Sequence, residues 1–165
     1  MVNRVTFSPR ERLERASLRV AMHIRGLWEE KGSSDTRLLE ALLIPDELVL
    51  VGRSKAFPGK GRREHVVPRL VIIAECHGML AKGATDEAIA AFIRDHVKIV
   101  MISEDECRRL DRSTDLGLRQ RMPADWKVGD DVFARLKAAG IDWEPLTDGN
   151  AWSPDSGAGS DVQAS

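Results

Sequence analysis

The chain has little of what marks exported or membrane proteins. None of its apolar runs approaches the roughly 20 residues that a membrane-spanning helix needs. Residues 1–19 are rich in Arg and Glu and contain no apolar signal core, so no export is expected. The chain has only two cysteines, Cys76 and Cys107, and no CxxC pair, which favours reduced, partly buried thiols over a disulfide. The lack of a membrane-spanning run, of a signal core and of paired cysteines predicts a cytoplasmic protein that makes no membrane contact. We expect it to be of bacterial or phage type.

What the composition does contain fits one globular domain. Hydrophobic residues make up 42% and charged residues 31% of the 165 residues, shares that are typical of folded proteins with a single core. No internal repeat is present. We expect one domain over residues 1–147, and we expect the Gly-, Ser- and Asp-rich residues 148–165 to form a disordered tail.

The hydrophobic pattern predicts an α+β fold that is mainly helical, with a small β-hairpin or short sheet. Ser8 and Glu11 can form a capping box around Pro9, and apolar residues at steps of three and four continue this helix to about Lys31. The predicted parts are N-terminal helices within residues 9–44, a strand–strand–helix core over about 47–112, and a C-terminal helix over 130–139. Strands are expected over residues 47–52, 63–67 and 98–103, with helices from Pro68, Thr85 and Ser103.

Positive charge is concentrated between Gly52 and Arg69. This stretch holds six Lys or Arg against one acid, Glu64, which leaves a local charge of +5 in a chain of net charge −1. Such a patch attracts phosphates by Coulomb attraction and by counterion release. Nucleic acid is therefore the expected partner, with DNA favoured over RNA. The residues expected to bind it are Arg53, Lys55, Lys60, Arg62, Arg63, Arg69, Arg108 and Arg109.

Three pieces of the sequence combine acids with histidine and can converge into one metal site. They are Glu64-His65 on a predicted strand, Asp95-His96 before the next strand, and the acidic first turn Glu104–Glu106 of the following helix. A histidine can act as a general base that takes a proton from water. Carboxylates or imidazole can hold a hard cation such as Mg²⁺, which stabilises the leaving phosphate oxygens.

The run Glu64-His65-Val66-Val67-Pro68 resembles the Asp/Glu-His-apolar-x-Pro signature of HNH (His-Me finger, ββα-metal) endonucleases. The stretch from His96 to Asp105 is similar to the second half of that signature, in which an Asn, a strand and a metal-binding residue at a helix start follow one another. Where the family has the middle Asn and the distal His, this chain has His96 and Asp105. The resemblance implies divalent-metal-dependent phosphodiester hydrolysis, with His65 as the general base. It implies metal ligands at Glu64, His96, Asp105 and Glu106.

Each of these residues also has a simpler explanation. Glu64 and His65 can form a surface pair that bridges to neighbouring arginines, His96 can interact with a helix dipole, and Glu104–Glu106 can cap a helix. Two other functions therefore stay open. One is a non-catalytic module on a degenerate HNH-like fold that grips nucleic acid or a protein partner without any cofactor, for example as a phage or host-defence accessory. The other is a protein-binding helical adaptor whose interface is the long N-terminal helix.

Overall fold

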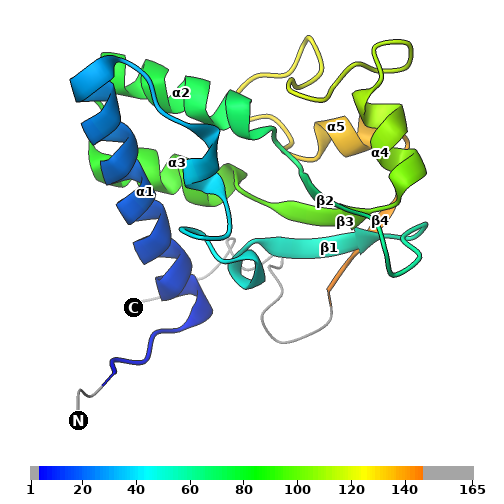
Figure 1. Ribbon diagram of the computed structural model, residues 1–165, viewed down its shortest axis with the longest axis horizontal. Coiled ribbons are helices and arrows are strands. Elements are labelled where there is room, and N and C mark those ends of the chain that lie inside the picture. Colours follow the sequence, from blue (N-terminus) through cyan, green and yellow to red (C-terminus); the bar gives the residue numbers. More distant parts are fainter. Residues whose placement is uncertain (1–3, 147–165) are drawn as a thin grey trace, which may run out of the picture.

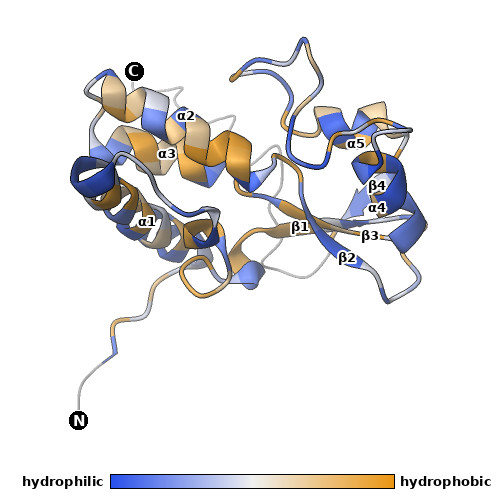
Figure 2. Ribbon diagram, turned by 45° about the horizontal axis from the view of Figure 1, so that its top comes forward, coloured by the Kyte–Doolittle hydropathy of each residue, from blue (hydrophilic) through white to orange (hydrophobic). Residues whose placement is uncertain are grey.

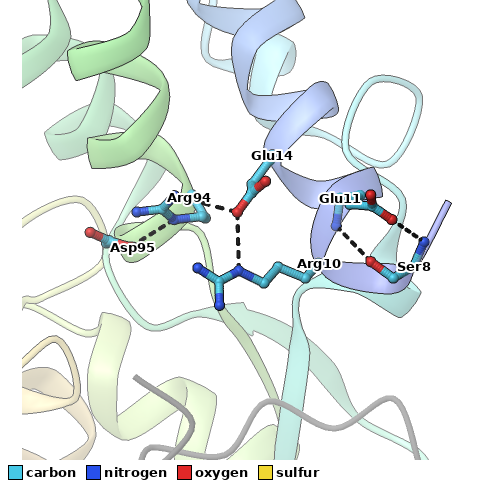
Figure 3. A network of polar contacts seen from close by, with 6 residues as sticks. All are labelled: Ser8, Arg10, Glu11, Glu14, Arg94 and Asp95. Atoms are coloured by element: carbon cyan, nitrogen blue, oxygen red, sulfur yellow. Dashed lines mark hydrogen bonds and ion pairs between the residues drawn. The ribbon is translucent and has the colours of Figure 1, made fainter. Parts of the chain in front are cut away.

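In the computed structural model, which describes residues 4–146, the first helix lies where its local signals predict. Helix α1 (Pro9–Lys31) begins at Ser8, whose hydroxyl accepts the backbone N–H of Glu11. The Glu11 carboxylate accepts the backbone N–H of Ser8 at 2.8 Å and completes the capping box (Figure 3). The helix ends at Gly32, whose φ of 68° is a left-handed conformation that glycine adopts at little cost.

Helix α1 packs along α3 (Asp86–His96), and α2 (Arg69–Ala81) completes a helical group at one end of the molecule (Figure 1). Polar contacts join α1 to α3 at both ends. Glu14 pairs with Arg10 at 3.1 Å and lies 3.9 Å from Arg94 of α3 (Figure 3). At the other end, Arg25 binds Asp86 at 2.5 Å. These contacts hold α1 against α3, and the buried residues of α1 form part of the core.

The other end of the molecule is a four-stranded sheet, counted within the described residues (Figure 1). Its strands are β1 (Leu50–Ser54), β2 (Arg62–His65), β3 (Ile99–Ile102) and β4 (Trp143–Pro145), in the order β2-β3-β1-β4. Strands β1 and β3 are parallel, and the two edge strands run antiparallel to their neighbours. The central strands are mostly hydrophobic and buried, whereas β2 is hydrophilic (Figure 2). The fold is thus α+β and mainly helical, as predicted.

Three local predictions need correction. Strands β1 and β2 form no hairpin, because the apolar β3 pairs between them. The second of the helices predicted within residues 9–44, expected over 34–43, is not an α-helix: this stretch contains the 3₁₀ turn η1 (Thr36–Leu39), and a second 3₁₀ turn, η2 (Asp46–Leu48), follows Pro45. The last helix, α5 (Ala134–Ala138), is shorter than 130–139 because side chains of Asp130 and Asp131 bind backbone N–H groups in turns instead.

Helix α4 (Glu104–Asp111) begins at Ser103 with the predicted capping box, since Ser103 and Glu106 bind each other's backbone N–H groups. Both cysteines are free and buried, as expected. Among the residues described, no helix combines the length and the apolar character that crossing a membrane requires. The tail predicted over residues 148–165 lies outside the described residues.

Candidate nucleic-acid interface and strand–strand–helix unit

Strands β2 and β3 and helix α4 form a strand–strand–helix unit in the predicted order. Glu64 pairs with Val100 and His65 with Ile99 across the antiparallel ladder. Helix α4 follows β3 after one residue, Ser103, and contacts β2. Helices α2 and α3 are inserted between the two strands of this unit (Figure 1). Glu64 and His65, as neighbours on one strand, point to opposite faces of the sheet.

The Glu64 carboxylate is held by a buried arginine from α5. Arg135 has 0% of its side chain exposed and donates to Glu64 Oε1 at 2.8 Å. The same guanidinium donates to the carbonyl oxygens of Leu118 at 2.9 Å and His65 at 2.6 Å. Burial raises the pKa of the Glu64 carboxyl, and the charge of Arg135 offsets part of that rise. Arg135 therefore ties α5 and the segment after α4 to strand β2.

His65 lies on the other face of the strand, and within residues 4–146 neither of its ring nitrogens has a hydrogen-bond partner. Burial, together with the positive charges of Arg69 and Arg63, lowers the pKa of His65 to about 4. The imidazole is therefore neutral at pH 7, which is the protonation state of a general base. Both nitrogens are buried, so water or substrate reaches them only if neighbouring side chains move.

The remaining predicted metal ligands each have other partners. His96 is buried, with Nδ1 2.8 Å from the Phe92 carbonyl oxygen. Asp105 is 91% exposed and pairs with Arg108 at 3.1 Å. Glu106 is buried and accepts the Ser54 hydroxyl at 2.6 Å. Within residues 4–146, no three His, Cys, Asp or Glu side chains are grouped closely enough to hold one metal ion.

A surface depression of about 440 Å³ lies between the β1–β2 loop and the start of α4. The acids Glu104, Asp105 and Glu106 line it, whereas Glu64 and His65 do not. The cations that line it are Lys60 from the loop and Arg108 with Arg109 from α4. Arg62 does not line it, but its backbone pairs with Ile102, two residues before α4 begins, and its charge acts on the Cys107 thiol of that helix. We call the exposed group Lys60, Arg62, Arg108 and Arg109 the basic corner.

Much of the predicted positive charge is balanced by acids that are distant in sequence. The distant pairs are Arg53–Glu144, Lys55–Asp142, Arg63–Asp46 and Arg69–Glu40, and Arg108 pairs locally with Asp105, three residues before it. Lys60, Arg62 and Arg109 form no ion pair within the described part of the chain and are exposed. The three cations of the predicted set that have no ion pair among these residues therefore all belong to the basic corner.

Sequence reasoning missed three residues of this region: Arg135, Glu40 and Asp46. Arg135 had a recognisable signal, because in the predicted helix over residues 130–139 it stands at helical spacing from the apolar Val132 and Ala139. Glu40 and Asp46 had none, since their arginine partners lie in a different segment.

Comparisons of this chain with protein-family models, with curated proteins and with solved structures found no match. The resemblance to HNH endonucleases thus continues to rest on Glu64–Pro68 and on the strand–strand–helix order.

Proposed function

We propose that the protein binds nucleic acid, without catalysis, through the basic corner. The observation that supports this most directly is the convergence of four exposed cations from the β1–β2 loop, β2 and α4 at one depression, which the acids of the first turn of α4 also line. Three of these cations form no ion pair within residues 4–146. Phosphates are the natural ligands of such a group, because arginine and lysine gain Coulomb energy and release condensed counterions there. Arg108, now paired with the highly exposed Asp105, is available to exchange that partner for a phosphate, since exposed ion pairs contribute little.

Replacing Lys60, Arg62 and Arg109 by Ala should weaken binding to a DNA duplex and flatten its salt dependence. The slope of log K against log salt should lose about one unit for each phosphate contact removed, so about three in all. Fluorescence anisotropy at several salt concentrations measures both quantities. The matched control replaces Lys31, Lys82 and Lys127, which are exposed cations elsewhere, and changes the net charge equally. Equal loss in both triple variants would show that only overall charge matters and would contradict the assignment of the basic corner.

A second candidate function is divalent-metal-dependent endonuclease activity. It is favoured by the order β2–β3–α4 and by the neutral imidazole of His65, whose ring nitrogens have no hydrogen-bond partner within residues 4–146. Glu64, His96, Asp105 and Glu106 would then have to exchange their present partners for Mg²⁺ or a similar ion. Binding without catalysis is better supported because Glu64 and Glu106 already serve as partners of Arg135 and Ser54.

If the endonuclease hypothesis is correct, plasmid DNA should be cleaved with Mg²⁺ or Mn²⁺ and protected by EDTA. His65→Ala should then slow cleavage by roughly 10²–10⁴-fold and leave DNA affinity unchanged, because a general base contributes to rate and little to binding. Circular dichroism checks that the variant is folded. Full cleavage by folded His65→Ala would contradict the proposed mechanism, and absence of cleavage by the wild type would leave the binding function alone.

A further inference from the structure

Two arginines beside His65 are held by carboxylates from one neighbouring segment. Arg69 pairs through Nη1 with Glu40 Oε1. Arg63 lies 2.5 Å from Asp46 Oδ1 and 3.6 Å from Glu40 Oε2. Glu40 follows the turn η1, and Asp46 begins the turn η2, so both acids come from the connection between α1 and β1. We call the group Glu40, Asp46, Arg63 and Arg69 the arginine–carboxylate cluster.

An anion from solution can replace the carboxylates of this cluster as the partner of the two arginines. Its four side chains are between 31% and 38% exposed, so solvent reaches every member. Ion pairs at such positions gain little over hydration, because water screens the charges. The segment that carries the acids is anchored independently of them, through Leu39 and Ile44, which are both buried in the core. Release of the carboxylates therefore does not require the segment to unfold.

The carboxylates match the chemistry of a phosphate. Arginine binds the planar carboxylate and the phosphate group with the same pair of N–H donors. A single carboxylate, Glu40, is shared by two guanidinium groups, which is also how two arginines hold one phosphodiester. His65 lies between Arg63 and Arg69 in the sequence, and both of its buried ring nitrogens lack a hydrogen-bond partner among the described residues.

We propose that Arg63 and Arg69 form a second phosphate site, which Glu40 and Asp46 occupy in the free protein and which a nucleic-acid phosphodiester takes over on binding. This inference rests on the proposed function. Strand β2 is an edge strand that carries Arg62 and Arg63 on opposite faces. A nucleic-acid strand that follows this edge contacts the basic corner first and then reaches Arg63 and Arg69. The two acids thus lower the affinity of the free protein by competing for the arginines.

The test removes the competing charges and keeps the side-chain shapes. The variant E40Q/D46N should bind a short fluorescein-labelled DNA duplex roughly tenfold more tightly than wild type at moderate salt, with a salt dependence steeper by about one to two units. The matched control E29Q/E47Q removes two acids that pair with Arg25 and Arg12 of α1. It changes the net charge equally and should alter the affinity by about twofold at most. Adding R63A/R69A to E40Q/D46N should abolish the gain.

Three results would overturn this inference. If E40Q/D46N binds no more tightly than E29Q/E47Q while the basic-corner triple variant still loses affinity, the arginines are structural and only the proposed function stands. If R63A/R69A leaves the gain intact, the extra affinity arises elsewhere. If no variant binds DNA at low salt, the proposed function fails and the second site fails with it. The single variants E40Q and D46N, each expected to give part of the gain, replace the double variant should it not fold.

Discussion

Replacing Arg135 by Met should lower the free energy of unfolding by about 3–5 kcal/mol, because removal of one partner leaves the other charge buried and unpaired. The Glu64 carboxylate would lose its 2.8 Å partner, and the carbonyl oxygens of Leu118 and His65 would lose their donor. Methionine fills much of the vacated volume, so the effect reports the lost polar contacts more than a cavity. Urea denaturation followed by circular dichroism measures the change.

Two further variants make this result specific. Lys137→Met removes the other cation of α5, which is 73% exposed and pairs with Asp131, and should change the free energy of unfolding by less than about 1 kcal/mol. The double variant Glu64→Gln with Arg135→Met should be more stable than Arg135→Met alone, because the unpaired carboxylate is then absent. A loss near 1 kcal/mol in Arg135→Met, or no recovery in the double variant, would contradict the described role of Arg135.

Acidification from pH 6.5 to 4 should destabilise the protein by about 3 kcal/mol through His65 alone. The pKa of this histidine is about 4 in the folded protein, against 6.5 without the fold. Because the unfolded state binds the proton more tightly, the stabilising contribution is complete above about pH 6.5 and is lost as the pH falls toward 4. A difference of this size corresponds to about 1.4 kcal/mol for each pKa unit.

Measurement of the free energy of unfolding against pH for wild type and His65→Leu separates this effect from the titration of carboxylates. Asp46 lies near His65 and pairs with Arg63, so wild type loses further stability where the acids become protonated. The leucine variant should show a flatter curve between pH 6.5 and 4, with the difference reaching about 3 kcal/mol. Parallel curves for the two proteins would mean that His65 is solvated and that its burial has been misassigned.

Local signals were sufficient to predict much of the secondary structure. The boundaries of α1 follow from the Ser8–Glu11 capping box and from Gly32, and the start of α4 follows from Ser103 and Glu106. These interactions involve residues within one helical turn, so the sequence order alone specifies them. Strand order depends on pairing between distant segments, and the parallel contact of β1 with β3 had no local signal.

The charge pattern predicted the binding residues only in part, because ion pairs also form between residues that are distant in sequence. The local excess between Gly52 and Arg69 is real in the sequence, but Arg63 and Arg69 find their acids at Asp46 and Glu40. Glu64 finds its cation 71 residues away, at Arg135. Sequence neighbours therefore did not predict spatial neighbours, and within residues 4–146 the cations of the predicted set that form no ion pair are Lys60, Arg62 and Arg109.

The most direct test of nucleic-acid binding is a titration of the ¹⁵N-labelled protein with a short DNA duplex, followed by NMR. The proposed function predicts that the amide signals that shift most will cluster in residues 58–62 and 103–109, with a weaker response near Arg63 and Arg69. The effect should diminish as salt is added, because the contacts are with phosphates. No shift at low salt, or shifts confined to the exposed face of α1, would contradict the assignment of the basic corner as the binding surface.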